Sequence, residues 1–323
     1  MAARGAHLGI LQWARENGCK WNRETCARAA AGGDLEVLQW AWMKGADWDV
    51  RTNNEAAGRG DLKMLQFVRR LNCPHSLEGI MAAVRNGHLE AVKWLGRGHP
   101  LPLCVSYAAA RHGHLHVLEW LARHHLWNNA GTCEAAAIGG HLGVLQWART
   151  SGCDWDDRTC SSAARRGHLD IVQWARTTGC DWNMYTCILA AHGGHLELLK
   201  WARVNGCPWD SRVCTRAASR GDIEMFKWAR CNGCPWESIT CANAAAGGHL
   251  EVLQWAHCNG CPWDEHTCTR AAAAGRLDIL QWARAAGCPW DQNTETAAKQ
   301  NGHRRVEEWA RLNGCPKEVV GGT

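Results

Sequence analysis

Cysteine and histidine are the residues of this chain whose types could support chemistry most readily. The 323-residue sequence contains 19 Cys and 17 His, and thiolate and imidazole groups serve as nucleophiles, general bases and zinc ligands. The strongest candidate for a metal site is Cys231-x-x-Cys234, which is followed 27 residues later by Cys258-x-x-Cys261. A zinc ion would need all four sulfurs at about 2.3 Å.

The spacing of these groups argues against a metal site. Equivalent positions in neighbouring helical modules lie about 8–10 Å apart, so four sulfurs do not readily converge on one ion. A second cluster consists of His112, His114, His116, His124 and His125. The first and third of these have helical spacing, but Gly113 interrupts a helix between them. We therefore expect neither a bound metal ion nor a cofactor.

Catalytic constellations are absent from the sequence. It contains no glycine-rich phosphate loop, no His-Glu-x-x-His and no paired carboxylates in a segment that occurs only once. Cysteine and histidine recur at regular intervals instead, whereas a catalytic pair would be unique in the chain. We therefore predict that the protein is not an enzyme.

The composition indicates a repeated module in a reducing compartment. The chain has 21 Trp but only 2 Tyr and 2 Phe, a ratio that arises when one Trp position is copied many times. An odd number of Cys and no apolar signal segment favour an intracellular location, the cytoplasm or the nucleus. No run of 18 apolar residues predicts a membrane span. The net charge of +5 is too small to indicate nucleic-acid binding.

A glycine followed by His, Asp or Arg marks the repeat. The marker recurs every 27 residues, with a single step of 26. Its glycines are Gly33, Gly60, Gly87, Gly113, Gly140, Gly167, Gly194, Gly221, Gly248, Gly275 and Gly302, and Ala6-His7 is a degenerate further copy. The sequence therefore predicts eleven full units and one partial unit.

Each unit is predicted to form two short helices. In segment 157–183, Asp156 or Asp157 can cap the first helix, and Gly167 ends it in a conformation that other residues resist. The second helix, residues 169–177, places its apolar residues on one wide stripe. Neither helix is long enough to be stable alone in water, so neighbouring units must bury the stripes, as in a solenoid.

The unit resembles the ankyrin repeat. Residues 132–145 read TCEAAAIGGHLGVL, similar to the family's T-P-L-H-x-A-A-x-x-G-H-x-x-V-V with one residue fewer at the start. The family period is about 33 residues, and the loss here falls where the family builds a β-hairpin finger. The resemblance therefore implies an all-α, elongated, ankyrin-like solenoid of stacked helix-turn-helix repeats without fingers.

The resemblance covers nearly the whole chain. We predict one repeat domain over residues 1–318, with a partial unit at 1–22, full units over 23–318, an irregular unit near 77–102 and a flexible tail at 319–323. Short Trp- and Cys-rich repeats also look like those of ankyrin proteins carried by giant DNA viruses of amoebae. That likeness implies a viral origin and a location in the host cell.

The recurring Trp and Cys residues are interpreted as packing rather than chemistry. The Trp of the second helix, at Trp147, Trp174, Trp201, Trp228, Trp255 and Trp282 among others, are predicted to form the structural core. The Trp of the loops are predicted to cover the end of each helix pair. Free cysteine behaves as a small apolar residue, so the repeated Cys are expected to be buried and unpaired. The marker histidines are expected to bond the backbone between units.

Positions that vary between units while facing solvent are the candidate binding residues. They lie on the first helix and are mostly basic. The candidates are Arg28, Arg59, Arg85, Arg111, Arg165, Arg166, Arg216, Arg220 and Arg270. Guanidinium groups suit carboxylates, so this ridge of Arg favours a partner with an acidic segment.

These patterns together predict a monomeric, non-catalytic protein-protein interaction scaffold whose concave or first-helix face binds an unknown partner, with no membrane contact. Two alternatives stay open. The first is the substrate-recognition part of a ubiquitin-ligase adaptor, although residues 1–22 contain no F-box segment of the kind that such relatives carry. The second is binding of nucleic acid or another acidic ligand through the Arg ridge, which the overall charge does not favour.

Overall fold

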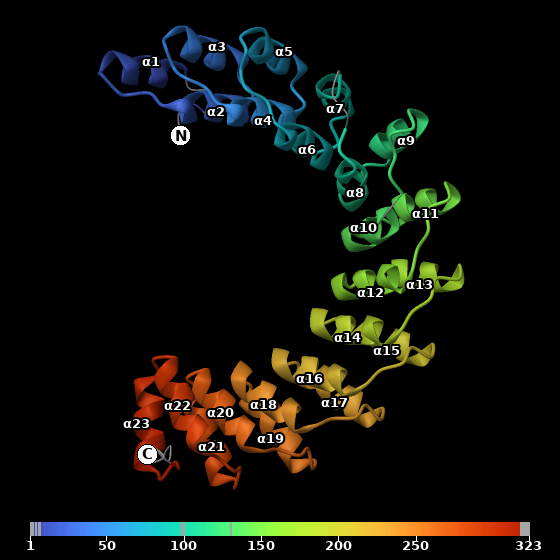
Figure 1. Ribbon diagram of the computed structural model, residues 1–323, viewed down its shortest axis with the longest axis vertical. Coiled ribbons are helices and arrows are strands. Elements are labelled where there is room, and N and C mark those ends of the chain that lie inside the picture. The colour runs from blue at the N-terminus through green and yellow to red at the C-terminus, as the bar shows by residue number, and fades with distance from the viewer. Residues whose placement is uncertain (1–2, 4, 6–7, 98–100, 130, 317–323) are drawn as a thin grey trace, which may run out of the picture. The chain divides into compact units, whose positions relative to one another are not determined.

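The computed structural model describes residues 3, 5, 8–97, 101–129 and 131–316, and all regular structure in these residues is helical (Figure 1). The helices are α1 (Leu8–Glu16), α2 (Arg23–Gly32), α3 (Leu35–Met43), α4 (Val50–Arg59), α5 (Leu62–Arg70), α6 (Leu77–Arg85), α7 (Leu89–Leu95), α8 (Cys104–Arg111), α9 (Leu115–Arg123), α10 (Thr132–Gly139), α11 (Leu142–Thr150), α12 (Asp157–Arg166), α13 (Leu169–Thr177), α14 (Met184–Gly193), α15 (Leu196–Val204), α16 (Ser211–Arg220), α17 (Ile223–Cys231), α18 (Ser238–Gly247), α19 (Leu250–Cys258), α20 (Glu265–Ala273), α21 (Leu277–Ala285), α22 (Gln292–Gln300) and α23 (Arg304–Leu312).

The described helices follow the predicted repeat. From α2 onward they alternate between a first helix, which carries an even number, and a second helix, which carries an odd number. No strand occurs in the described ranges, so the loops between repeats build no β-hairpin finger there. The chain is therefore an all-α, ankyrin-like solenoid of helix pairs, as the sequence predicted.

The contacts divide the chain into two compact units. Unit 1 spans Met1–Trp155 and unit 2 spans Asp156–Thr323. Each unit is itself a row of helix pairs, and each is described separately below. The single repeat domain over residues 1–318 stays a prediction, and the predicted tail 319–323 lies outside the described residues.

Capping residues explain where the first helices begin and end. The Asp156 carboxylate accepts a hydrogen bond from the backbone N–H of Arg158 and so starts α12. At the other end Gly167 adopts φ of 82°, and its N–H bonds back to carbonyls of the last turn. Asp210 and Gly221 bound α16 in the same way.

Small residues let the first helices pack closely. Their buried positions are mostly alanine and cysteine, as in α18, where Cys241, Ala242, Ala244 and Ala245 are buried. Consecutive first helices contact each other closely along each row, whereas consecutive second helices contact each other sparsely. In unit 2 the second helices therefore fan apart while the first helices form a continuous surface (Figure 1).

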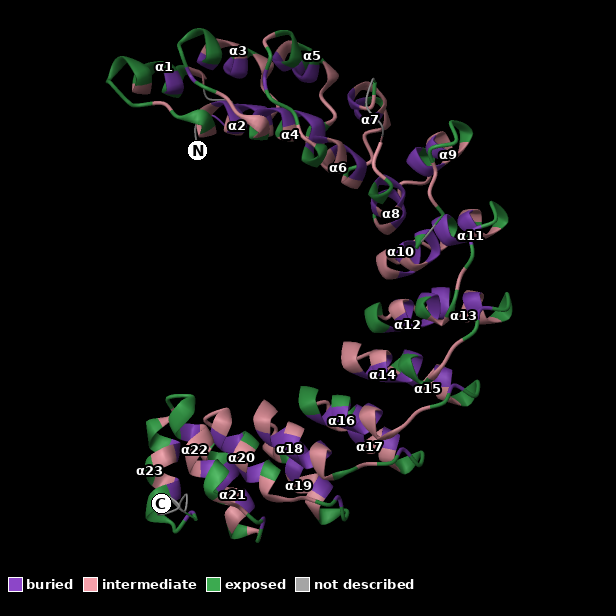
Figure 2. Cartoon of the chain, in the orientation of Figure 1, coloured by how far each residue is buried: buried purple, intermediate pink, exposed green. Residues whose placement is uncertain are grey.

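The core lies between the two helices of each pair. The second helix contributes branched aliphatic residues and alanine, such as Ile171, Val172 and Ala175 of α13, and all three are completely buried (Figure 2). Burying one such aliphatic side chain stabilises the fold by roughly 1.5–3 kcal/mol. Stacking against the neighbouring pair is what removes these side chains from water.

The helical tryptophans lie at the edge of this core rather than inside it. Trp147, Trp174, Trp201, Trp228, Trp255 and Trp282 are all half-buried, and Trp13 in α1 is 65% exposed. The prediction that they form the buried core is therefore corrected. Because the second helices fan apart, the side of each helix that faces the next pair stays partly open to solvent.

The irregular unit differs mainly in its second helix. Helix α7 has seven residues, whereas α5 and α9 have nine each. Gly96 follows it directly, and the next first helix begins only at Cys104. Of the residues between, 98–100 lie outside the described ranges.

Candidate interaction surface

Histidines join consecutive repeats through the backbone. His114 Nε2 lies 2.7 Å from the carbonyl oxygen of Arg85, and His249 Nε2 lies 3.1 Å from that of Ser219. A carbonyl oxygen only accepts hydrogen bonds, so Nε2 carries the proton in both contacts. Each acceptor lies two residues before the glycine that follows its first helix. These contacts support the predicted structural role of the marker histidines.

Where the marker residue is Asp, an arginine makes the equivalent hydrogen bond to a carbonyl of the preceding first helix. These side chain-to-backbone bonds between repeats are called joints below. The Asp222 carboxylate caps α17, and Arg220 Nη1 donates to the carbonyl oxygen of His192 at 3.0 Å. Arg59 Nη1 likewise donates to the carbonyl oxygen of Ala31 at 3.1 Å in a unit whose marker is also Asp. Arg59 and Arg220, two of the predicted partner-binding residues, therefore have a structural bond.

Most loop tryptophans are packed against an arginine of the preceding second helix, and several also contact the next helical tryptophan. The Arg176 guanidinium lies 4.4 Å from the ring centroid of Trp182, and that ring lies 5.8 Å from Trp201 at 66°. Arg176 also donates a hydrogen bond to the Cys180 carbonyl. The cation–π pairs recur at Arg15–Trp21, Arg149–Trp155, Arg203–Trp209, Arg230–Trp236 and Arg284–Trp290. Each contributes roughly 0.5–2 kcal/mol, and together they close the short loops.

The buried thiols tie each loop to the preceding one. Cys180 Sγ donates to the Asp156 carbonyl oxygen at 3.3 Å, and Cys207 Sγ donates to the Asn183 carbonyl oxygen at 3.4 Å. A hydrogen bond to Cys180, together with burial, raises the pKa of Cys160, so that thiol stays protonated. The Cys residues of the chain are free of disulfides.

The two Cys-x-x-Cys segments do not converge. Cys231 and Cys258 are exposed, whereas Cys234 and Cys261 are buried. Throughout the described ranges, no group of three or more His, Cys, Asp or Glu residues is placed to hold a metal ion. None of the described helices has the length and apolar character needed to cross a bilayer.

In unit 1 the predicted arginines of the first-helix face are largely neutralised. Arg28 pairs with Glu24 at 2.7 Å, and Arg85 pairs with Glu78 at 2.8 Å. Exposed Glu55 of α4 adds a further carboxylate to this face. Arg111 of α8 is half-buried and makes no ion pair with any described residue.

Three of the predicted arginines in unit 2 lack a counter-charge among the described residues. Arg165 and Arg166 end α12, Arg216 lies in α16, and all three are exposed without an ion pair or hydrogen bond from their side chains to described residues. His192 of α14 lies between them, and burial together with Arg216, Arg165 and Arg220 lowers its pKa. Arg165, Arg166, His192, Arg216 and Arg220 are called the α12–α16 basic cluster below.

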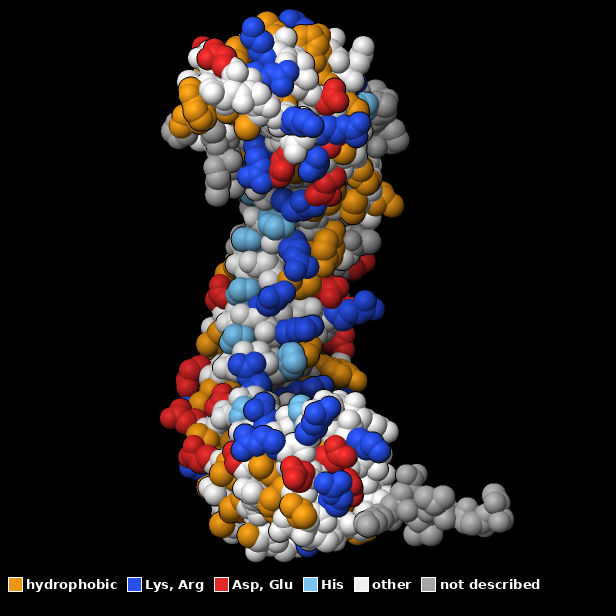
Figure 3. Space-filling model, turned by 90° about the vertical axis from the view of Figure 1, so that its left-hand side faces the viewer, with side chains coloured by type: hydrophobic (Ala, Val, Ile, Leu, Met, Phe, Trp, Pro, Cys, Tyr) orange, Lys and Arg blue, Asp and Glu red, His pale blue; other side chains and the backbone are white. Residues whose placement is uncertain are grey.

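Few carboxylates lie near this cluster. Helices α14 and α16 contain no Asp or Glu, and α12 contains only Asp157, which accepts a hydrogen bond from Asn183 in its first turn. Figure 3 shows Lys, Arg and His side chains gathered along the first-helix face, with acidic side chains mostly to its sides. Further along unit 2, Arg270 bonds the Asn243 side chain.

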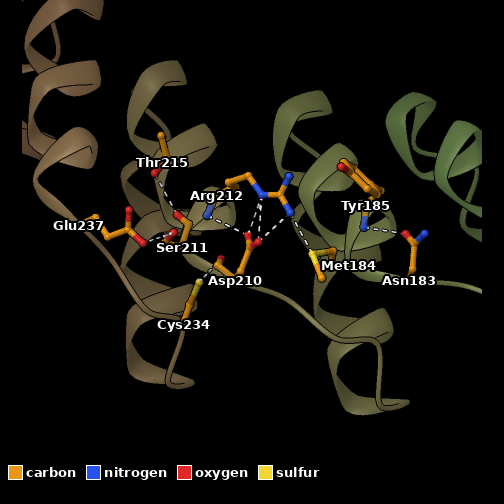
Figure 4. A network of polar contacts seen from close by, with 9 residues as sticks. All are labelled: Asn183, Met184, Tyr185, Asp210, Ser211, Arg212, Thr215, Cys234 and Glu237. Carbon is orange, nitrogen blue, oxygen red and sulfur yellow. Dashed lines mark hydrogen bonds and ion pairs between the residues drawn. The ribbon is translucent and has the colours of Figure 1, made fainter.

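A polar network fixes the opposite end of the same helices (Figure 4). Arg212 pairs with Asp210 at 2.8 Å, donates to the Met184 sulfur at 2.9 Å and lies 5.0 Å from the Tyr185 ring centroid. The Cys234 thiol donates to the Asp210 carbonyl oxygen. The Arg212 guanidinium is therefore already bound within the chain, and its contact with the Tyr185 ring fixes the position of that side chain.

Sequence reasoning did not single out Tyr185 or Arg212. Tyr185 is 49% exposed, and it is one of only 2 Tyr in the chain. Its rarity at a varying first-helix position was the signal that could have found it. The pairing of Arg212 with Asp210 could not be read as easily, because Asp210 also serves as a helix cap.

Comparisons with known proteins give likenesses of fold alone. No protein-family model matches the sequence, and no curated protein matches it. The pentatricopeptide repeat protein PPR10 in complex with an 18-nt psaJ RNA element aligns over 97% of this chain and 57% of its own, at 14% identity and a TM-score of 0.44. PPR10 from maize aligns over 99% and 63%, at 14% identity and a TM-score of 0.33. The human ASB11 ankyrin repeat domain aligns over 57% and 84%, at 14% identity and a TM-score of 0.32. The chain thus spans less than two thirds of the PPR10 chains that it matches.

Proposed function

We propose that this protein is a non-catalytic scaffold that binds a partner protein through its first-helix face. The observation that carries the proposal is the α12–α16 basic cluster, in which the exposed guanidinium groups of Arg165 and Arg166 on α12 and Arg216 on α16 have no partner among the described residues. Holding like charges close together is unfavourable unless a counter-charge is supplied. The structure supplies none nearby, so a partner is the natural source.

The repeat architecture supports this role. Repeats commonly present extended binding surfaces, and here the first helices form a continuous surface within each unit. The other repeated side chains have structural contacts: the marker histidines bond backbone carbonyls between repeats, the loop tryptophans stack on arginines, and the buried thiols bond loop carbonyls. The free thiols suit a reducing compartment, so the cytoplasm or nucleus is the proposed location. Because the short repeats resemble those of giant-virus ankyrin proteins, host-cell proteins are the first partners to look for.

The test is affinity capture followed by mass spectrometry. The full chain, a triple variant R165E/R166E/R216E and a control variant R304E/R305E are used as bait. The control reverses two charges, against three in the triple variant, at exposed positions of the second helix α23. Circular dichroism and thermal melting establish that all three baits are folded.

The proposal predicts that partners recovered with the parent chain and with R304E/R305E are depleted at least tenfold with the triple variant. Equal recovery with all three baits would remove the first-helix face of unit 2 as the binding surface. Ubiquitin-ligase subunits among the depleted partners would identify the adaptor alternative. A nucleic-acid role would appear as recovery that nuclease treatment abolishes.

A further inference from the structure

We infer that the α12–α16 basic cluster is a docking site for an extended acidic peptide segment of about six residues. The inference rests on the proposed use of the first-helix face and adds the chemical class of the partner. It concerns only residues of unit 2, from three consecutive first helices that contact one another in sequence.

The first argument is the state of the guanidinium groups. Arg165, Arg166 and Arg216 have exposed side chains that bind neither a carboxylate nor a carbonyl of the described chain. Arginine presents a planar fork that matches a carboxylate with two parallel hydrogen bonds. One nitrogen of the Arg220 guanidinium, Nη1, donates to the His192 carbonyl oxygen. The positive charge of Arg220 nevertheless adds to that of the cluster.

The second argument is the contrast with unit 1. There, Arg28 and Arg85 occupy first-helix positions of the same kind, but each is bound to a glutamate of its own helix. Helices α14 and α16 lack any such glutamate. The missing counter-charges at Arg165, Arg166 and Arg216 are therefore a local property of these helices, because other first-helix arginines are paired with a carboxylate.

The third argument is geometry. Packed helices lie about 8–10 Å apart, so the arginines of α12 and α16, with His192 of α14 between them, span roughly 20 Å. An extended strand advances about 3.3 Å per residue, and about six residues therefore cross the cluster. Acidic side chains near the two ends of such a segment would meet the arginines of α12 and α16, and its middle would pass His192 of α14.

A peptide fits this surface better than a nucleic acid. The basic track stops at α18, which contains no Lys or Arg and whose Asn243 is already bound by Arg270. Single-stranded nucleic acid also requires aromatic rings on which bases stack, and one face of Tyr185 is covered by Arg212. A short acidic segment needs neither a long track nor a free ring.

The probe is a fluorescein-labelled peptide with eight consecutive glutamates, read by fluorescence anisotropy against the full chain at low and at moderate salt. We expect saturable binding that weakens as salt rises. R165E/R166E and, separately, R216E should weaken it at least tenfold, whereas R304E/R305E should change it less than twofold. Thermal melting of each variant separates a lost site from a lost fold, and R165Q/R166Q supplies a milder change should the reversal unfold the protein.

Three outcomes would overturn the inference. The first is no saturable binding, the second is equal binding by the parent chain and R165E/R166E, and the third is tighter binding of a twelve-nucleotide oligouridine than of the peptide. The capture experiment distinguishes this failure from that of the proposed function. If captured partners still depend on Arg165 and Arg166 while the peptide does not bind, the scaffold role stands and only the acidic class is wrong.

Discussion

Arg59 and Arg220 replace histidine at the joints between repeats. In most units a marker histidine reaches back to a carbonyl of the preceding first helix, as His303 does to Ala273 at 3.1 Å. Where Asp takes the marker position, its short side chain caps its own helix and cannot reach that carbonyl. An arginine near the end of the first helix then spans the gap.

This exchange predicts the effect of removing one joint. Arg59→Ala should lower the free energy of unfolding by about 1 kcal/mol, because the Ala31 carbonyl loses its side-chain donor. Arg70→Ala is the matched control, since Arg70 is exposed and its side chain has no partner in the described chain. Urea unfolding of both variants measures the difference. Equal stabilities would show that the joint contributes nothing.

His192 makes the stability and the binding depend on pH in opposite directions. Burial and the charges of Arg216, Arg165 and Arg220 lower its pKa, and α15, which also packs against α14, contributes no charge to this shift. The unfolded chain therefore binds this proton more readily, so its stabilising contribution is complete above the usual His pKa of about 6.5 and declines as pH falls below it.

An acidic peptide bound beside His192 should reverse that shift, because a negative neighbour favours the imidazolium ion. Peptide affinity should therefore rise as pH falls from 7.5 to 5.5, a range in which glutamates stay ionised. His192→Asn should flatten this dependence without abolishing binding. Anisotropy titrations at several pH values provide the measurement, and a pH profile that H192N leaves unchanged would contradict the assignment.

At the scale of the helix pair, the sequence predicted the elements well because their signals are local. Caps such as Asp156 and terminators such as Gly167 lie within one turn of the helix ends that they determine. The burial of the helical tryptophans was harder to predict, because it depends on how closely the second helix of the next pair packs against them. Periodicity places Trp174 on the apolar side of α13, but it does not reveal that consecutive second helices fan apart.

The glycines that end first helices provide a test at this scale. Gly167 has a positive φ of 82°, and a Cβ there would lie 2.5 Å from His195 Nδ1. Gly167→Ala should therefore destabilise the protein by about 1–2 kcal/mol or more. Gly143→Ala is the matched control: it lies inside α11 in open space and should stabilise by about 0.5–1 kcal/mol. Thermal melts that shift both variants in the same direction would contradict this account.

At the scale of the whole molecule, the exposure of the cysteine thiols shows how far neighbouring repeats shield each other from solvent. Of the 19 cysteines, only Cys19, Cys104, Cys231 and Cys258 are exposed. Burial raises the pKa of Cys73 to about 11 and that of Cys26 to about 12, and a protonated thiol reacts slowly.

Iodoacetamide should therefore label four cysteines in the native protein and all 19 after denaturation. Intact-mass spectrometry counts the labels, and peptide mapping identifies the sites. Rapid labelling of Cys73 under native conditions would mean that this loop thiol, which donates to the Asp49 carbonyl, is not protected by the preceding repeat.

The positions of the candidate binding arginines were easier to predict than the contacts that their side chains make. The sequence placed all nine candidate arginines on first helices, where the structure also finds them. It did not separate occupied from free guanidinium groups. The pairing of Arg28 with Glu24 has a readable helical spacing, but the bond from Arg59 to Ala31 crosses between repeats and depends on how they stack. Only Arg111, Arg165, Arg166 and Arg216 of the nine lack a side-chain partner in the described residues.

The most direct measurement of the central claim is arginine footprinting of a captured complex. Phenylglyoxal modifies exposed guanidinium groups, and peptide mapping compares the free scaffold with the partner-bound one. Partner binding through the first-helix face predicts strong protection of Arg165, Arg166 and Arg216, with Arg304 and Arg305 modified equally in both samples. Unchanged modification of the first three, or protection confined to α23, would contradict the account.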